Sequence, residues 1–140
     1  MRATSTFTVS DFTPTESPST IGDQPMIITA ASSGLSYMTK TFTGQLSGSS
    51  VTWFLGALNQ QTGAGSYAAL EAIEAELAGR AGTFNVVHAA STSGQDRFDE
   101  HFAIVPGSGT GELAGISGSG ELRIDPDGTH HFDLEYAFED

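Results

Sequence analysis

Residues Tyr67–Gly82 read YAALEAIEAELAGRAG, and this stretch decides between an all-β chain and a chain that contains a helix. Its Ala, Glu and Leu content favours a helix, and Leu70, Ile73 and Leu77 recur at helical spacing. In a strand, the same residues would alternate between two faces, one of which carries Glu71 among apolar neighbours. Composition alone therefore favours a helix here.

The end of this stretch belongs to an internal repeat that changes the prediction. The pattern Leu-x-Gly occurs at Leu46–Gly48, Leu77–Gly79 and Leu113–Gly115, each time between two strand candidates. Glycines between strands supply the positive φ angles that tight hairpins and bulges need. If Leu77–Gly79 leads into such a hairpin, the residues before it form a strand. We therefore predict a strand over Tyr67–Leu77.

Period-two alternation is clearest near the C-terminus. Apolar residues alternate with charged or polar ones over Gly120–Asp125 and again over His131–Phe138, and Pro126–Gly128 supplies a turn between them. Met26–Ala31 is a shorter apolar stretch, and Thr13–Gln24 reads as a loop. Five further segments read as strands: Ala3–Val9, Tyr37–Leu46, Ser50–Leu58, Phe84–His88 and Phe98–Val105.

Many short antiparallel strands joined by Gly-rich turns indicate a sandwich or a barrel, and a closed barrel has no exposed edge strand. A length of 140 residues suits one domain with one substantial core. We therefore expect an all-β fold, a small closed antiparallel barrel of about eight strands that spans residues 1–140.

Several segments resemble a bacterial family of small uncharacterised proteins. The Gly-rich stretch Val105–Gly118 is similar to one signature of that family, and Leu70–Glu71 with Leu77–Phe84 is similar to a second. Lys40–Gly44 and Leu134–Phe138 also fit. The resemblance implies an eight-stranded barrel of the allene oxide cyclase type. Barrels of related shape in plant dirigent proteins and bacterial spirotetronate cyclases act on apolar substrates without cofactors. The resemblance therefore implies that this protein needs no cofactor. A shared fold does not fix a function.

The charge of the chain excludes several partners. There are 17 acidic and 5 basic residues, and the formal net charge is −12. Nucleic-acid binding draws on clustered Lys and Arg, which are scattered singly here, so neither nucleic acid nor an anionic membrane is an expected partner. The chain has no cysteine, and no apolar stretch follows its first residues, which predicts a cytoplasmic location.

Sequence motifs for common chemistries are missing. Gly107-x-Gly109-x-Gly111 lacks the third glycine of the dinucleotide fingerprint, and we interpret it as a hairpin connection. No Gly-x-Ser-x-Gly elbow occurs. The four histidines show no recognised ligand spacing, because His130 and His131 are adjacent and point to opposite faces of a strand. We therefore expect no metal.

The candidate site consists of ionisable groups on apolar strand faces. Glu71 shares a face with Tyr67 and Ile73, and His88 shares one with Phe84 and Val86. Counted back from a turn near Arg80-Ala81, the two lie nearly opposite each other, which makes them the predicted acid and base in the barrel. A purely structural pair is the alternative. The residues predicted to shape the ligand site are Trp53, Glu100, Phe102 and Tyr136.

Three functions stay open at this point. The first is a cofactor-free isomerase or cyclase that acts on an apolar substrate in the lumen. The second is a barrel that binds a small apolar molecule without changing it, and the third is a filled barrel that acts through its surface or its oligomer. Apolar residues on both faces of the strand around Val51, Trp53 and Phe54 predict a homo-oligomer formed through the outer face of the barrel.

Overall fold

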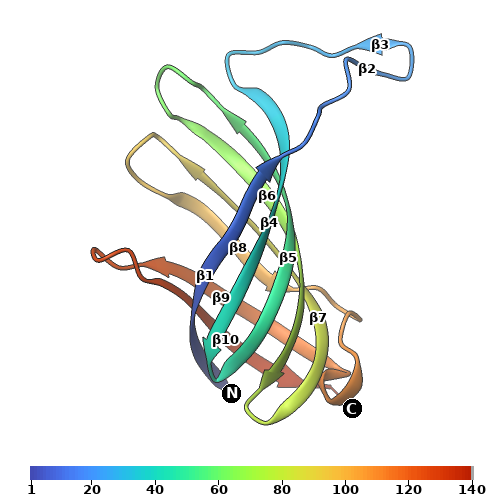
Figure 1. The fold of residues 1–140 in the computed structure, drawn as a ribbon, viewed down its shortest axis with the longest axis vertical. Coiled ribbons are helices and arrows are strands. Elements are labelled where there is room, and N and C mark those ends of the chain that lie inside the picture. The colour runs from blue at the N-terminus through green and yellow to red at the C-terminus, as the bar shows by residue number, and fades with distance from the viewer. Residues whose placement is uncertain (140) are drawn as a thin grey trace.

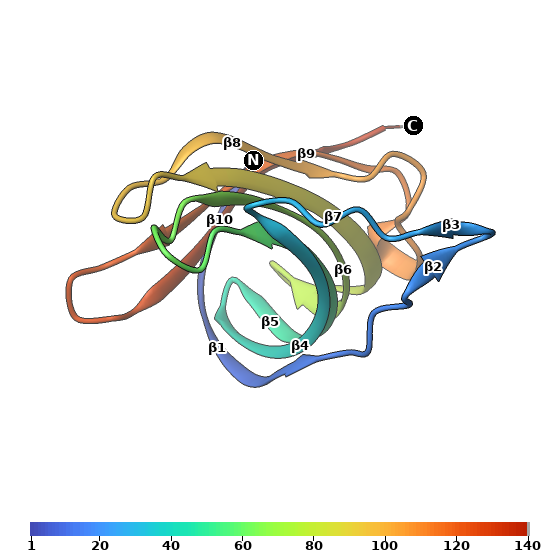
Figure 2. The ribbon, with the colours of Figure 1, turned by 90° about the horizontal axis from the view of Figure 1, so that it is seen from above.

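A computed structural model, which describes residues 1–139, shows an all-β chain whose main sheet closes into an eight-stranded antiparallel barrel (Figures 1 and 2). The strands follow each other around the barrel in the order β1-β10-β9-β8-β7-β6-β5-β4. The predicted fold class is therefore confirmed. The barrel strands are β1 (Arg2–Pro14), β4 (Ser32–Gly44), β5 (Leu46–Leu58), β6 (Gly65–Leu77), β7 (Arg80–Thr92), β8 (Phe98–Ile104), β9 (Ile116–Ile124) and β10 (His130–Phe138).

The Ala/Glu-rich segment is a strand, as the repeat predicted. It forms β6, which ends at Leu77 and turns into β7 through Ala78 and Gly79. Both turn residues have positive φ, 47° and 89°, which is the conformation of a type I′ hairpin turn. The requirement for this turn, together with pairing on both edges of β6, outweighs the helical propensity of the segment.

The barrel is filled at one end. The apolar core comprises inward-facing residues from most strands together with Leu113, which a short 3-10 helix (Gly111–Leu113) between β8 and β9 inserts into it. This helix lies against the start of β7, where Thr110 N donates to Thr83 O. The filled end is therefore the one with the β6–β7 turn, near the chain termini in Figure 1. The largest fully buried apolar side chains are Phe42, Phe84, Phe132, Leu46, Ile73, Leu77, Leu113 and Leu134.

The seam between β8 and β9 is the weakest part of the barrel wall. Within the described residues these strands pair at one position, Ala103 with Ser119. Residue Asp99 has a positive φ of 53°, and the register of β7 against β8 shifts between Ala89 and Ser91. A bulge at the start of β8 therefore accompanies the loss of pairing between β8 and β9.

Two segments differ from the sequence interpretation. Residues 26–31 form no strand and connect β3 (Gln24–Pro25) to β4, with Ile27 and Ile28 exposed. The predicted loop before them contains the small sheet of β2 (Thr20–Ile21) and β3, which projects from the barrel (Figure 1). The Gly-rich connection before β9 joins neighbouring antiparallel strands as expected, but it includes the 3-10 helix. No helix within residues 1–139 is long and apolar enough to cross a membrane.

Candidate functional site

Four polar side chains meet inside the barrel above the apolar core. They come from four consecutive strands: Lys40 from β4, Ser50 from β5, Glu71 from β6 and His88 from β7. Each occupies an inward position in the alternation of its strand, and all four are buried. A buried charge is costly unless it is paired, so the geometry of this cluster decides its chemistry.

The Glu71 carboxylate is the centre of the cluster. The Lys40 Nζ atom donates to its Oε1 atom at 2.9 Å, and the Ser50 hydroxyl donates to its Oε2 atom at 2.5 Å. The Nε2 atom of His88 lies 3.4 Å from Oε1. Glu71 is 0% exposed, whereas Lys40 and His88 are 3% and 4% exposed. The carboxylate is therefore held from three sides and is not in contact with solvent.

The cluster keeps Glu71 ionised. Burial raises the pKa of this carboxyl, whereas the His88 ring, the Lys40 ammonium and the Ser50 hydroxyl lower it. The lowering prevails, so the pKa of Glu71 falls below its ordinary value. At neutral pH this group is an anion that positions its neighbours. It is not a proton donor.

A polar path leads from this cluster to the mouth of the barrel. The Nδ1 atom of His88 lies 3.4 Å from the Tyr67 hydroxyl, which accepts a hydrogen bond of 2.6 Å from Arg97. Arg97 also pairs with Glu100 at 2.8 Å. Burial raises the pKa of Tyr67, and although Arg97 opposes this rise, the net pKa stays above its ordinary value. Tyr67 therefore remains a neutral hydroxyl between His88 and Arg97.

Aromatic rings form the walls beside this path. The rings of Phe54 and Tyr67 stack at 4.8 Å between centroids, and those of His88 and Phe102 stack at 5.6 Å. Phe102 also packs edge-on against Phe132 in the core. The His88 ring is thus held by stacking on Phe102 and by the contact of Nδ1 with Tyr67, whereas Nε2 lies near Glu71 without making a hydrogen bond.

The open half of the barrel contains a cavity of about 220 Å³, which we call the lumen cavity. Lys40, Tyr67 and His88 reach it directly, whereas Glu71 lies behind them. The other lining residues are Phe7, Val9, Met38, Phe54, Arg97, Leu122, Arg123, Ile124 and His130. The lumen cavity is therefore a mainly apolar space with a few converging polar groups, which is typical of small-molecule sites.

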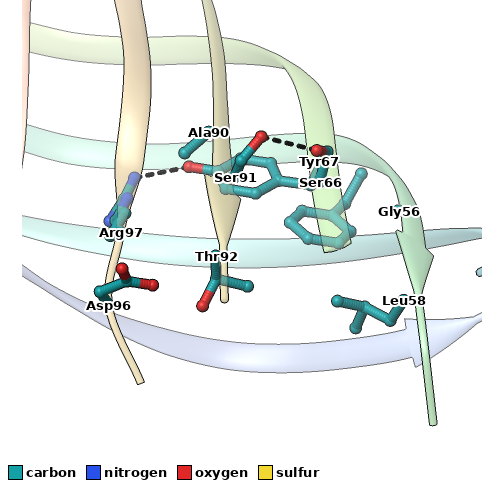
Figure 3. Close-up of a pocket in the computed structure, with 10 residues that line it drawn as sticks. Gly56, Leu58, Ser66, Tyr67, Ala90, Ser91, Thr92, Asp96 and Arg97 are labelled. Carbon is teal, nitrogen blue, oxygen red and sulfur yellow. Dashed lines mark hydrogen bonds between the residues drawn. The ribbon is translucent and has the colours of Figure 1, made fainter. Parts of the chain in front are cut away.

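Two further cavities adjoin it. The rim cavity, also about 220 Å³, shares Phe54, Tyr67 and Arg97 with the lumen cavity. Figure 3 shows that Arg97 points at the Tyr67 hydroxyl and that a hydrogen bond joins Ser66 and Ser91 beside it. A side cavity of about 270 Å³ lies between β8 and β9 and reaches His88 through the weak seam. His88 can therefore be approached from the mouth and from the side.

The predicted site residues divide into two groups. Glu71 and His88 both face inward as predicted, although the turn is at Ala78-Gly79, so His88 pairs with Ala69 and lies diagonal to Glu71. Phe102 also faces the interior beside His88. The catalytic and binding roles of these residues stay predictions.

The other three predicted residues lie elsewhere. The expectation that Trp53 faces the lumen is wrong: its side chain is on the outer face, 57% exposed, next to Tyr37. Glu100 is exposed at the rim, because the bulge at Asp99 breaks the alternation that predicted an inward position. Tyr136 faces inward but packs in the apolar core beside Phe138.

Sequence reasoning missed Lys40, Ser50 and Arg97. A signal for Lys40 was present, since it alternates in phase with Met38 and Phe42 and is the charged member of that apolar face. Ser50 and Arg97 gave no such signal, because a serine on a half-polar strand and an arginine in a loop are ordinary. Among residues 1–139 no group of three or more His, Asp or Glu is placed to hold a metal ion.

Comparison with known proteins places the chain in a family. The family model described as a protein of unknown function, DUF3224, matches residues 3–136. The chain belongs to the DUF3224 family. A DUF3224 protein of unknown function from Shewanella oneidensis MR-1 has a similar crystal structure, with a TM-score of 0.80 and 29% sequence identity over 100% of this chain and 98% of that one. No protein with a curated description matches the sequence of this DUF3224 member.

Proposed function

We propose that this barrel binds a small, mainly apolar molecule in the lumen cavity, and that His88 moves a proton on that molecule without a cofactor. The observation that carries the proposal is the convergence of Lys40, Tyr67 and His88 on an otherwise apolar cavity. This arrangement supports an isomerase of the kind found in allene oxide cyclase-type barrels. The three groups have different parts in it.

The roles follow from what each group can donate or accept. The His88 imidazole, acting as a base, takes a proton from the α-carbon of a β,γ-unsaturated carbonyl compound. It returns that proton to the γ-carbon as the double bond moves to the α,β position, so the substrate is isomerised with no net loss of atoms. The ammonium of Lys40 and the hydroxyl of Tyr67 face the same cavity and donate to the oxyanion that forms meanwhile. Glu71 is a positioning residue, because it touches Lys40 and His88 but does not line the cavity.

A non-catalytic binding barrel is the second candidate. This candidate is favoured by the hydrogen bonds of Glu71, because both carboxylate oxygens already accept one, from Lys40 and from Ser50. Such an arrangement is expected of a structural ion pair. The third function, a filled barrel, agrees with the apolar core at one end but not with the cavity at the other.

Exchange of the α-hydrogens of cyclohexanone in D₂O, followed by proton NMR, separates the first two candidates. Catalysis predicts that the wild-type protein accelerates exchange over buffer, that His88→Gln loses the acceleration, and that His131→Gln, which alters an imidazole paired with Asp125 outside the cavity, keeps it. Exchange at the buffer rate would overturn the catalytic proposal. Binding itself is tested separately, with the pair of probes described below.

A further inference from the structure

The charged side chains that line the lumen cavity are basic, although the chain as a whole is strongly acidic. The protein has 17 acidic residues and 5 basic ones, yet three of the five, Lys40, Arg97 and Arg123, line this one cavity. Two histidines, His88 and His130, line it as well, and its lining includes no Asp or Glu. The three cations are far apart in the sequence, and the fold brings them together at this cavity.

Carboxylates hold these cations from behind. Lys40 pairs with Glu71, Arg97 pairs with Glu100 at 2.8 Å, and Arg123 pairs with Asp125 at 3.0 Å. Asp133 lies 3.7 Å from the other terminal nitrogen of Arg123. None of the four carboxylates lines the lumen cavity. Because a guanidinium has five N–H donors and an ammonium has three, each cation keeps donors for a group inside the cavity.

We infer that the ligand of the lumen cavity is a small apolar carboxylate, an inference that rests on the proposed binding function. The apolar wall of Phe7, Met38, Phe54 and Leu122 suits its body. The cations suit its acid group, since charge-assisted hydrogen bonds from Lys and Arg to a carboxylate are strong and directional. A cavity of about 220 Å³ admits a single ring or a short branched chain.

Cyclohexanecarboxylate and cyclohexanecarboxamide test this inference, because they have the same shape and differ in charge. Titration of ¹⁵N-labelled protein with each, followed by NMR, should show saturable shifts at lumen residues, with the carboxylate bound roughly tenfold or more tightly. Equal or tighter binding of the amide would overturn the inference but not the proposed function. Binding of neither probe at millimolar concentration would overturn the proposed function.

Variants then locate the acid group. Arg97→Gln and Arg123→Gln should weaken binding of the carboxylate much more than binding of the amide, because only the carboxylate carries the charge that these cations neutralise. Arg80→Gln is the matched control, since Arg80 lies over the Phe138 ring at the opposite end of the barrel and should change neither affinity. Loss of both probes' binding in Arg97→Gln and Arg123→Gln alike would contradict a role in recognising charge.

The outer face of the barrel supports a second, independent proposal. Strand register aligns one outward row, Tyr37, Trp53, Leu70, Val87 and Ala103, across five strands from β4 to β8. The rows on either side place Leu55 and Val51 next to Trp53. We call these three rows the outer patch; its other members are Leu35, Thr39, Ala68, Ala72, Asn85, Ala89 and His101.

Size and charge indicate what covers the outer patch. It contains no Lys, Arg, Asp or Glu in a chain of net charge −12. Its five most exposed large side chains, Tyr37, Val51, Trp53, Leu55 and Leu70, are each between 41% and 57% exposed. Together they expose on the order of 600 Å², close to the roughly 800 Å² that each partner buries in a standard interface. This area is at the upper end of the range for the largest apolar patch on a typical monomer, and such patches are often interaction sites.

We propose that the outer patch packs against the same patch of a second copy of this chain. A two-fold dimer brings uncharged surface onto uncharged surface and keeps the acidic remainder of both chains apart. Trp53 is the chain's one tryptophan and lies within the patch, so its fluorescence reports on the contact.

Sedimentation at micromolar concentration tests the dimer. The wild-type protein should sediment as a dimer, and Leu70→Glu should sediment as a folded monomer with red-shifted Trp53 emission. Ile28→Glu is the control, because Ile28 is 90% exposed outside the outer patch and the variant should remain dimeric. A monomeric wild type, or a dimer that survives both Leu70→Glu and Val51→Glu, would overturn the proposal.

Discussion

Lys40 and Glu71 form a buried ion pair across a strand that lies between them. The Nζ and Oε1 atoms are 2.9 Å apart, although β4 and β6 each pair with β5 and not with each other. Ser50 of that intervening strand binds the second carboxylate oxygen. The pair thus joins three neighbouring strands at the boundary between the filled and the open half of the barrel.

Replacing the anion of this pair should destabilise the fold. Glu71→Gln leaves the Lys40 ammonium buried without a counter-charge, which we expect to cost about 3–5 kcal/mol in the free energy of unfolding. Urea denaturation measures this cost. Glu74→Gln is the control, since Glu74 lies on the exposed face of the same strand and its loss should change stability little.

Removing both charges should restore much of the loss. Lys40→Met with Glu71→Leu replaces the ion pair by apolar groups of similar size, which is often neutral or stabilising. If Glu71→Gln alone were as stable as the wild-type protein, the ion pair would not be a structural element of this barrel.

The same pair should make stability depend on pH in acid. Because the folded-state pKa of Glu71 lies below its ordinary value of 4.5, its contribution is complete above that value. It is lost as the pH falls through the lower, folded-state pKa. The difference in unfolding free energy between wild type and Glu71→Gln should therefore be constant near neutral pH and shrink below about pH 4.5.

Two other acidic groups do not obscure this comparison. Hydrogen bonds from Ser93 lower the pKa of Asp96, and hydrogen bonds from Thr129 lower that of Asp127. Both groups are present in both proteins, so their contributions cancel. If the difference in unfolding free energy between wild type and Glu71→Gln grew as the pH fell, the pKa of Glu71 would be raised by folding. That result would contradict the lowered pKa.

Gly118 should tolerate no side chain. Its φ is +144°, and an added Cβ would meet the carbonyl oxygen of Glu135 and lie 2.9 Å from the Cα of Tyr136 on β10. We expect Gly118→Ala to lower the free energy of unfolding by about 1–3 kcal/mol. Gly34→Ala is the control, because a Cβ there meets nothing within 4 Å and its φ is ordinary. Equal stability of the two variants in urea would contradict this packing.

The fold was largely predictable because barrel formation follows from short-range patterns. Alternation located β9 and β10, and the Leu-x-Gly repeat identified the β6–β7 turn despite the helical composition of β6. The apolar stretch Met26–Ala31 forms no strand and is largely exposed, so its composition does not indicate its place in the fold.

The site was predictable only in part. Glu71 and His88 stand out in the sequence as ionisable residues on apolar faces. Both faces of β5 carry apolar residues, so the sequence does not show that Thr52 points inward and Trp53 outward. The sequence likewise does not reveal the bulge at Asp99, which places Glu100 at the rim. The gathering of Lys40, Arg97 and Arg123 depends on the closure of the barrel, which joins residues far apart in sequence.

The environment of His88 on addition of a ligand tests the central claim most directly. The account predicts that the ring nitrogen resonances of His88 in ¹H–¹⁵N spectra shift saturably with cyclohexanecarboxylate, while those of His131, outside the lumen cavity, do not. Unchanged His88 resonances at millimolar concentrations of both the carboxylate and the matching amide would contradict a ligand site in this barrel.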